Sequence, residues 1–533
     1  METSLARLQK QVDSLNKHIV RLQDCLAHQK EEKNRIRTDF NKYKKQTEVR
    51  IEKAVQNAVD KAVTKITTEY EKIIKEKDQR IFELENRLNI NSDNSSLPSS
   101  KTPIYQSKIC NSRKKTEEKP GRKLGHKKDK LKRFEDDEIT EIKEHKTEKC
   151  LNCNSTNLKM IGVKERDEYD IEVKVKKIRH KFYEYECLDC GKKIKSTIPL
   201  ELHGENQYGD GIKTLALTLS NYGFVAYNRI RKIIYGLTDG EVDPSEGYLN
   251  KLQKKASDKL KNFIFDTKEE ILKSKLNYWD DTVISIGEKD HACLRVYTNG
   301  DYVLYKAHLA KNIEGMDKDG ILQNLPSECT VMHDHLLHNY CDKYSYKNIE
   351  CNAHITRKLE GITQNAKHNW SDDMKNLLKS TLEKRKINIE NHVTCFTDEE
   401  IKDFDNKYDA IIEARFKEYI EFKHKYEFER EENLLEFMRD YKSPITEWVR
   451  DYSLPFSNNL CESLLRMLKS KMKISYQFKS LSYAEYFANI MTYTETCGRF
   501  GENKVVALKR LFENNPYTIE ELNTIKEKTT SYQ

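Results

Sequence analysis

Apolar residues near the start of the chain recur with alternating steps of three and four positions. The first seven are Leu5, Leu8, Val12, Leu15, Ile19, Leu22 and Leu26, and residues 1–90 contain no glycine or proline. A heptad seam of this kind is typical of a coiled coil. The pattern loosens over residues 29–50 and returns between residues 55 and 88. We therefore predict a dimerising coiled coil over residues 1–92, with a helix folded back on its own chain as the alternative.

A second helical pattern covers residues 204–272. Apolar positions have helical spacing over residues 215–222, 226–235 and 248–260, and the turn before the last stretch ends at Ser245, a residue type that caps helices. The last stretch carries Lys251, Lys254 and Lys255, which we expect to be exposed. Two helices joined by a turn suit a helix-turn-helix DNA reader, and a plain helical hairpin fits the pattern equally well.

The pattern changes after residue 273, where short apolar or β-branched runs are separated by turn residues. We predict strands over residues 276–286, 292–298, 302–308 and 330–333, and a helix that begins after Cys351. Residues 365–450 return to highly charged helical sequence, and further helices are predicted over residues 458–473, 481–497 and 504–512. This order of elements predicts a multidomain α+β protein, with residues 476–533 as a C-terminal helical region.

Charge is nearly balanced overall but is concentrated in one linker. The chain has 95 Lys+Arg and 87 Asp+Glu, a net charge of +8, so global charge indicates nucleic-acid binding only weakly. Residues 93–146 begin with a serine-rich break, and the stretch 101–133 contains thirteen basic and three acidic residues. This basic linker is predicted either to bind DNA phosphates or to be a solvated tether. Its candidate DNA-binding residues are Lys114, Lys115, Arg122, Lys123, Lys127 and Lys128.

Four of the thirteen cysteines form two Cys-x-x-Cys pairs, Cys150 with Cys153 and Cys187 with Cys190. Two such pairs, separated by alternating sequence at residues 169–175 that we expect to be a strand, are typical of a four-thiolate zinc ribbon. We predict this ribbon over residues 147–203, with one structural Zn²⁺. No run of about 18 apolar residues occurs. No membrane span is therefore predicted, and the cysteines are expected to be reduced and intracellular.

Three carboxylates occur where predicted strands and a helix suit two-metal chemistry on phosphodiesters. Asp280 lies in the first strand, Asp334 directly follows another, and Glu462 lies on a predicted helix. Acids in this arrangement bridge two Mg²⁺ or Mn²⁺ ions about 4 Å apart. Spacing alone does not select these three from 87 acids. Trp279, beside the first acid, is expected in the core rather than stacked on a base.

A series of ordered motifs resembles the transposases of the insertion sequence 66 family. The resemblance covers most of the chain, and motifs in this order are highly specific. In chain order they are residues 94–100 after the coiled coil, the Gly/His basic motif at 120–127, the two cysteine pairs, Asp280-Asp281-Thr282, residues 331–334 with Asn339-Tyr340, residues 351–357, and residues 458–475.

The resemblance implies an RNase-H-like catalytic domain over residues 273–475, with a helical insertion at about 365–450, and cut-and-join chemistry on DNA. It implies that Asp280, Asp334 and Glu462 hold two Mg²⁺ or Mn²⁺ ions, and it assigns Asp280 rather than Asp281 as the first acid. Neighbouring strand residues point to opposite faces, so only one of these two can face the metals. Implied partners are element-end and target DNA and accessory proteins of the same element, with a bacterial cytoplasmic, nucleoid-associated location.

Further motif residues flank these acids. His354 and Arg357 belong to the motif at 351–357, and His354 is expected to contact DNA or a catalytic acid. Asn459, Arg466 and Lys469 are spaced three or four residues from Glu462 or from one another, so they share its helix face. Arg466 and Lys469 are predicted either to hold the DNA backbone or to form a solvated face.

Some positions depart from the family pattern. His333 and His335 flank Asp334 where small residues are usual, and Tyr476 replaces an expected glycine. We expect His333, His335 and His338 to be exposed loop residues rather than parts of a transition-metal site with Cys351 and His354.

Two classes of function remain open from the sequence. The favoured one is an active DNA transposase, because all three acids and the ordered motifs are present. The alternative is a DNA-binding protein without catalysis, that is, a decayed or domesticated transposase. A nuclease with the same fold but no joining step is a weaker third hypothesis.

Overall fold

The computed structural model describes residues 7–15, scattered helical residues between 72 and 84, and residues 131–530 apart from 203, 367 and 420–424. The chain divides into two units, Met1–Leu88 and Asn89–Gln533. In the first unit the described residues are helical, and Leu8, Val12 and Leu15 are exposed. Most of the predicted coiled coil, and the basic linker as far as residue 130, lie outside the described residues. The coiled-coil dimer therefore stays a prediction.

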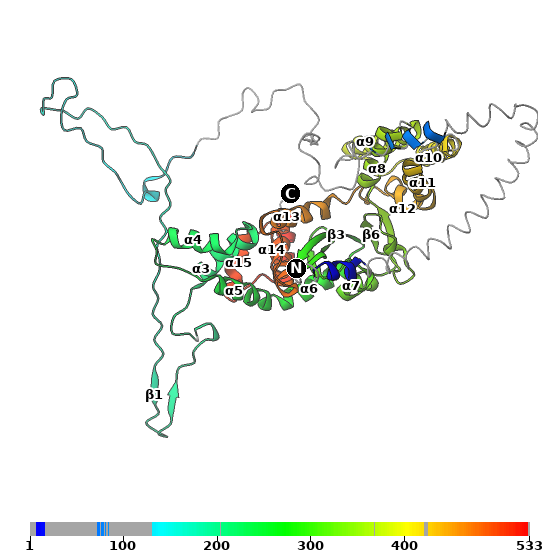
Figure 1. Cartoon of the computed structure of the whole chain (residues 1–533). Helices are drawn as coiled ribbons and strands as arrows, with labels where there is room; N and C mark the ends of the chain where they lie inside the picture. The colour runs from blue at the N-terminus through cyan, green and yellow to red at the C-terminus, as the bar shows by residue number, and fades with distance from the viewer. Residues whose placement is uncertain are drawn as a thin grey trace, which may run out of the picture. The chain divides into compact units, whose positions relative to one another are not determined.

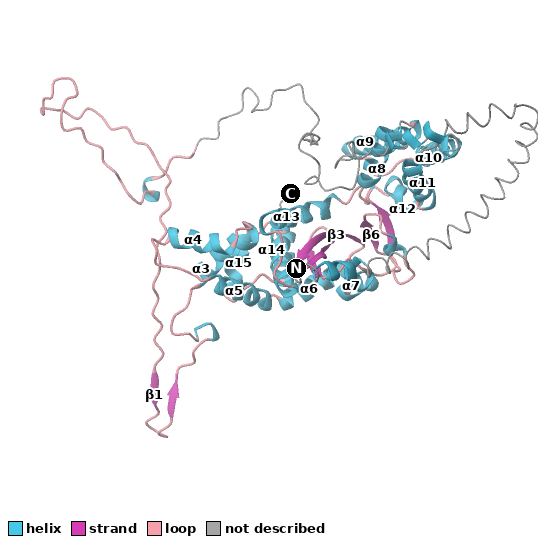
Figure 2. Cartoon of the chain, viewed as in Figure 1, coloured by secondary structure: helices cyan, strands magenta, loops and turns pink. Residues whose placement is uncertain are grey.

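Residues 131–202 contain few regular elements (Figure 2). These are the 3₁₀ turns η2 (Asp136–Glu138) and η3 (Leu200–Leu202) and the strands β1 (Glu184–Glu186) and β2 (Lys193–Lys195), which pair antiparallel around Cys187 and Cys190. The prediction of a strand at residues 169–175 is wrong, because that alternating segment has no partner strand. Alternation is not enough to form a strand, since the backbone hydrogen bonds of a strand must come from a neighbour.

Helices follow as the sequence predicts over residues 204–272. They are α3 (Asp210–Leu217), the π-helical turn η4 (Thr218–Tyr222), α4 (Tyr227–Leu237), α5 (Glu246–Lys259) and α6 (Lys261–Leu272). The predicted cap is confirmed, because the Ser245 hydroxyl accepts a hydrogen bond from the Tyr248 backbone N–H at 3.2 Å. On α5, Leu249 and Leu252 are buried, whereas Lys251, Lys254 and Lys255 are exposed as expected.

A five-stranded mixed sheet follows α6 along the chain. Its strands are β3 (Leu276–Ile286), β4 (Lys289–Thr298), β5 (Val303–His308), β6 (Thr330–His333) and β7 (Lys347–Glu350), in the order β5-β4-β3-β6-β7. Strands β3, β4 and β5 are antiparallel, and β6 and β7 run parallel to β3. All four predicted strands are confirmed. Strand β7 was not predicted, because its sequence Lys-Asn-Ile-Glu contains a single apolar residue.

Two long helices near the end of the chain pack on this sheet (Figure 1). α13 (Asn459–Ser475) contacts β3 and β4, and α14 (Leu481–Arg499) contacts β5. A buried cluster between them includes Val296, Tyr305, Leu465 and Phe487. The loops between strands contain α7 (Ile313–Asp319) and the 3₁₀ turns η5 (Leu322–Asn324) and η6 (Leu337–Tyr340).

The charged helical stretch predicted over residues 365–450, which was expected as an insertion, contains four helices, α9 (Asn369–Glu390), α10 (Asp398–Tyr419), α11 (Lys425–Asp440) and α12 (Lys442–Arg450). Together with α8 (Asn352–Ala366), which begins directly after Cys351 as predicted, they enclose a core of their own around Trp370 and Trp448. That core reaches Met332 of β6 and Ile349 of β7, so the insertion is anchored to the two parallel strands. No described helix is long and apolar enough to cross a membrane.

The last helices, α15 (Lys504–Phe512) and α16 (Ile519–Thr530), join the first ones in one core. A single buried cluster contains Leu252 of α5, Trp279 of β3, Tyr493 of α14 and Leu508 of α15. The residues on both sides of the expected boundaries at 272/273 and 475/476 therefore pack together. Periodicity along the chain does not reveal such a shared core, because it reports which face is apolar and not what covers that face.

Candidate active site

The register of the parallel strands aligns Asp280, Asp334 and Cys351. Position 278 of β3 lies opposite 332 of β6, and position 333 of β6 lies opposite 350 of β7. Continued past the ends of β6 and β7, this register sets Asp280 level with Asp334, and Asp334 level with Cys351. Matched positions on parallel strands point to the same face of a sheet. The carboxyl ends of β6 and β7 therefore bring Asp334 and Cys351 toward Asp280.

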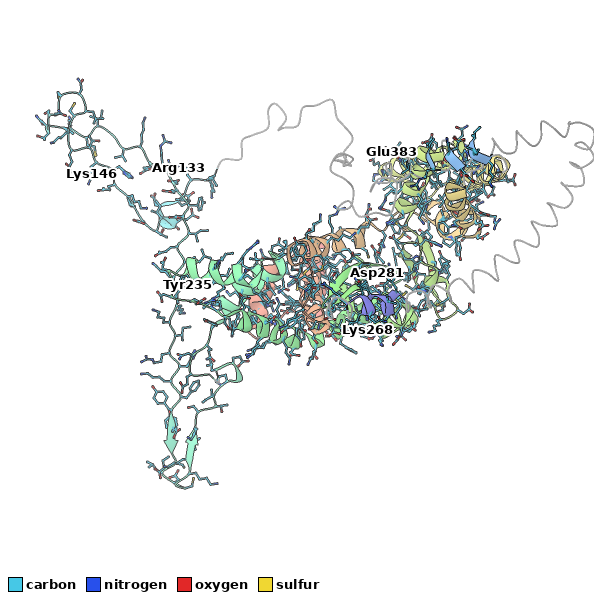
Figure 3. All side chains as sticks on the ribbon, in the orientation of Figure 1. Arg133, Lys146, Tyr235, Lys268, Asp281 and Glu383 are labelled. Atoms are coloured by element: carbon cyan, nitrogen blue, oxygen red, sulfur yellow. The ribbon has the colours of Figure 1, made fainter. Side chains whose placement is uncertain are left out.

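The two neighbouring aspartates of β3 lie in different surroundings. The Asp281 carboxylate contacts Lys311 Nζ at 2.5 Å and Arg295 Nε at 4.0 Å, and its side chain is 4% exposed within the packed residues around the sheet (Figure 3). Asp280 Oδ1 accepts a hydrogen bond from the Asp281 backbone N–H at 2.7 Å. Burial, followed by the nearby carboxylates of Asp334 and Asp281, raises the pKa of Asp280 well above its usual value. Asp280 is thus the aspartate that shares its surroundings with Asp334.

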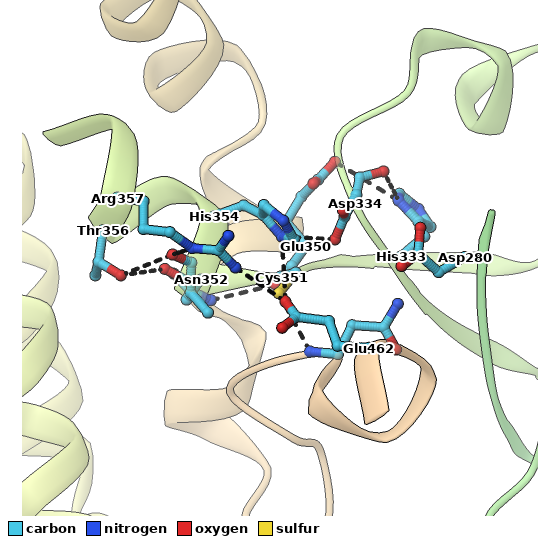
Figure 4. A network of polar contacts seen from close by, with 12 residues as sticks. Asp280, His333, Asp334, Glu350, Cys351, Asn352, His354, Thr356, Arg357 and Glu462 are labelled. Atoms are coloured by element: carbon cyan, nitrogen blue, oxygen red, sulfur yellow. Dashed lines mark hydrogen bonds and ion pairs between the residues drawn. The ribbon is translucent and has the colours of Figure 1, made fainter. Parts of the chain in front are cut away.

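Helix α8 links the second and third candidate acids (Figure 4). His354 Nδ1 lies 2.7 Å from Asp334 Oδ1 and 3.8 Å from Glu462 Oε1. Arg357 Nη2 donates a hydrogen bond to Glu462 Oε1 at 3.0 Å. His354 and Arg357 are three residues apart, so they project from one face of α8. The expected contact between His354 and a candidate acid is confirmed.

Asn458, directly before α13, fixes the start of the helix that carries Glu462. Its side chain is fully buried, and its Nδ2 donates to the Trp279 carbonyl at 2.9 Å. Its backbone N–H donates to Cys351 Sγ at 3.2 Å. The sequence motif indicated the neighbouring Asn459 and gave no sign of this role of Asn458. Asn458 and Asn459 are adjacent asparagines at the start of a helix, so the local sequence does not show that the first is buried and the second exposed.

Helix α13 separates its residues into two faces. Asn459, Arg466 and Lys469 are exposed, as a DNA-facing surface requires. The opposite face is buried against the sheet and consists of Cys461, Leu464, Leu465 and Leu468. Glu462 lies at the margin in the first turn, with 26% of its side chain exposed. The shared face predicted for Asn459, Glu462, Arg466 and Lys469 is consistent with this burial pattern.

The expectation of exposed histidines around Asp334 is wrong. His333 is fully buried, with Nε2 2.7 Å from Asn348 Oδ1 and Nδ1 2.9 Å from the Asp334 carbonyl. His335 is partly buried against the Phe437 ring, and His338 is also partly buried. The reason is tertiary, because β7 and the insertion cover the end of β6.

Glu350, at the end of β7, holds the loop that follows Asp334. This carboxylate is almost fully buried, and it lies 3.0 Å from His335 Nδ1 and accepts a hydrogen bond from the Tyr340 hydroxyl at 2.6 Å. Burial and this carboxylate raise the pKa of Tyr340. Trp279 is buried and stacks on Tyr297, so its core role is confirmed.

The two cysteine pairs are closed by matching turns. The Asn154 backbone N–H donates to the Cys150 carbonyl at 2.9 Å, and the Gly191 N–H donates to the Cys187 carbonyl at 2.8 Å. Backbone N–H groups inside each turn lower the pKa of Cys150 and of Cys187. Over the described residues, however, the four thiols do not form one group at ligand distance. The zinc ribbon stays a prediction.

Of the predicted DNA-binding residues, those of the basic linker lie outside the described part of the chain. These are Lys114, Lys115, Arg122, Lys123, Lys127 and Lys128.

Fold and site together define a mixed α/β protein with a carboxylate centre between a five-stranded sheet and the helices α8 and α13. Residues 205–486, just over half of the chain, match the family described as Transposase IS66 family, and the chain belongs to this family. The family makes the protein a DNA transposase, with DNA as its partner, and such enzymes generally use divalent metal ions such as Mg²⁺. A comparison with curated proteins finds no match.

Proposed function

We propose that this transposase cleaves and joins DNA at the ends of an insertion sequence, with Asp280, Asp334 and Glu462 as its catalytic carboxylates. The observation that carries the proposal is the convergence of these acids from a central strand, the end of its parallel neighbour and a helix packed on the central strand. The strand order, three antiparallel strands followed by two parallel ones, supports an RNase-H-like catalytic domain.

The donor atoms fit a pair of hard divalent cations. Carboxylate oxygens are the ligands that Mg²⁺ prefers, and Asp334 Oδ1 is buried without a hydrogen bond. Burial, followed by the neighbouring carboxylates, raises the pKa of Asp280, and bound cations would offset the cost of ionising it there. Two Mg²⁺ or Mn²⁺ ions held by the three acids would activate the attacking hydroxyl and stabilise the leaving oxygen.

Residues around the three acids hold the acid side chains in position. Arg357 fixes one oxygen of Glu462 by a charge-assisted hydrogen bond. Asn458 ties the start of α13 to the backbone beside Asp280. On the exposed face of α13, Arg466 and Lys469 are placed to contact DNA phosphates beside the acids.

The rest of the chain has proposed roles in binding DNA and in assembly. The helices α4 and α5 form a candidate helix-turn-helix, in which α5 presents Lys251, Lys254 and Lys255, and the basic linker adds phosphate contacts. We propose a homodimer through the coiled coil at residues 1–92. We also propose one structural Zn²⁺ held by the four ribbon cysteines, which is tested by metal analysis after Cys150 and Cys187 are both changed to Ser. Loss of one ion per chain is expected, and full retention contradicts the ribbon.

Substitution of the acids tests the catalytic proposal. Asp280→Ala, Asp334→Ala and Glu462→Ala should each abolish Mg²⁺-dependent cleavage and joining of element-end DNA while retaining DNA binding. Asp281→Asn is the matched control, because its carboxylate is held in ion pairs with Lys311 and Arg295, so its folded fraction should still cleave. Normal joining by the three alanine variants contradicts the proposal. DNA binding without cleavage by the unmodified chain would indicate the non-catalytic alternative, and cleavage without joining would indicate a nuclease.

A further inference from the structure

We propose that Asp334, Cys351 and His354 form a binding site for a thiol-seeking divalent cation of the Zn²⁺ type, separate in chemistry from the all-carboxylate Mg²⁺ site. Each residue offers one ligand atom, an oxygen, a sulfur and a nitrogen, and the three atoms lie within 4.8 Å of one another. Strand register brings Asp334 and Cys351 together, and the first turn of α8 returns His354 to the same point. This is the one such grouping of three or more ligands among the described residues.

Two of the three ligand atoms are buried without a hydrogen bond. Asp334 Oδ1 and His354 Nδ1 lie 2.7 Å apart, yet their orientation is not that of a hydrogen bond, and neither atom has another hydrogen-bond partner. Buried polar atoms are normally paired, so these two atoms are open to a cation that both would hold. Ligands around a tetrahedral Zn²⁺ lie roughly 3.4 to 3.8 Å apart, so binding requires Asp334 Oδ1 and His354 Nδ1 to move apart from 2.7 Å.

The mixed donor set favours zinc over magnesium. Thiolate and imidazole are ligands for Zn²⁺ and related ions, whereas Mg²⁺ takes oxygen ligands almost exclusively. The Asn458 backbone N–H donates to Cys351 Sγ at 3.2 Å, which fixes the direction of the sulfur. Coordination of the cation displaces a proton from the Cys351 thiol to solvent.

Binding of Zn²⁺ at this site inhibits the Mg²⁺-dependent reaction, a consequence that rests on the proposed function. Asp334 belongs to both sites, and Glu462 Oε1, which pairs with Arg357, lies 3.8 Å from His354 Nδ1. A Zn²⁺ ion held here withdraws Asp334 from the Mg²⁺ pair. The cation is therefore an inhibitor that competes with Mg²⁺.

Cobalt titration of the full chain tests the site independently of catalysis, because Co²⁺ replaces Zn²⁺ and its bonds to thiolate absorb light. Because Asp334 is shared, Co²⁺ lost from this site can be replaced by Co²⁺ on the carboxylates, so the thiolate-to-metal band is the readout rather than the stoichiometry. Wild type should show a stronger band than Cys351→Ser at the same Co²⁺ concentration. The ribbon cysteines contribute equally to both and cancel in the difference.

Cys461→Ala is the matched control, because Cys461 is a fully buried thiol of the same region that is not among the three ligands. It should keep the wild-type band. Circular dichroism and thermal melting establish that each variant is folded, and His354→Ala provides a second ligand variant if Cys351→Ser fails to fold. Equal spectra for wild type and a folded ligand variant at the same Co²⁺ concentration overturn the proposal.

Inhibition of cleavage gives the second readout. Added Zn²⁺ should slow Mg²⁺-supported DNA cleavage by wild type, and Cys351→Ser should need more Zn²⁺ for the same fractional loss of its own rate. Equal sensitivity of the two contradicts inhibition through this site. Absence of cleavage by wild type would refute the proposed function, while the cobalt titration would still decide whether the site exists.

Discussion

Asn458 offers the sharpest test of how the fold positions the candidate acids. Its buried Nδ2 donates to the Trp279 carbonyl at 2.9 Å, and the loss of a buried donor costs about 1–3 kcal/mol of unfolding free energy. Asn458 Oδ1 is itself buried without a partner, so deletion of the amide also removes an unfavourable group. For Asn458→Ala we therefore expect a loss near the lower limit, about 1 kcal/mol. Asn458→Asp should lose more, because it places a charged oxygen where the donor stood.

The effect on catalysis should be larger than the effect on stability. The contact sets the start of α13 relative to β3, and Glu462 lies in the first turn of that helix. A displacement of about 1 Å in a catalytic group costs on the order of 100-fold in rate. Single-turnover cleavage of element-end DNA in Mg²⁺ measures this rate, denaturant unfolding measures stability, and fluorescence anisotropy measures DNA binding, which should be unchanged.

Ser463→Ala is the control, since Ser463 is an exposed residue on the same helix. The reasoning is refuted if Asn458→Ala cleaves within about threefold of this control while its unfolding free energy falls. Asn458 would then stabilise the fold without positioning Glu462.

Three further substitutions should raise the unfolding free energy of the metal-free protein, measured by denaturant titration. The pKa of Asp280 is raised above the ordinary value of 3.8, so ionisation of Asp280 destabilises the folded protein as pH rises above 3.8. Asp280→Asn removes this cost and should therefore be stabilising at pH 7. The gain should shrink at low pH, where Asp280 is protonated, and in excess Mg²⁺, which stabilises the carboxylate. Burial lowers the pKa of Lys471 from 10.5 to about 8. Protonation of this buried amine therefore lowers the unfolding free energy in full below pH 8, and the loss disappears as pH rises toward 10.5. Lys471→Met should gain up to about 3 kcal/mol near pH 7, less the contribution of its contact with the Phe478 and Phe487 rings. Tyr476 has φ +59° at the end of α13, a conformation unfavourable for a residue with a Cβ, so Tyr476→Gly should gain about 1 kcal/mol. An unchanged or lower unfolding free energy would contradict the reason given for each.

Much of the catalytic region could be predicted from local pattern. Strands β3 and β6 have the predicted bounds, α8 begins after Cys351, and Ser245 caps α5. These features depend on neighbours along the chain, namely alternation, turn residues and capping side chains, which sequence contains directly.

The errors have a common cause. The segment at 169–175 alternates like a strand but has no partner, and β7 has a partner but almost no pattern. His333 was expected in an exposed loop and is buried, because the insertion and β7 cover it. Pairing and burial depend on residues far away in the chain, so periodicity does not report them.

The candidate acids show the same division. The sequence by itself determined the motifs that distinguish Asp280, Asp334 and Glu462 from 87 acids, and their order along the chain. Only the tertiary structure decided that Asp280 shares a face with Asp334, that Asn458 joins α13 to β3, and that Cys351 and His354 meet Asp334. Parallel register brings together positions 280 and 334, and helix packing brings together Trp279 and Asn458, which lie 179 positions apart. Such contacts follow from the whole fold rather than from any local stretch of sequence.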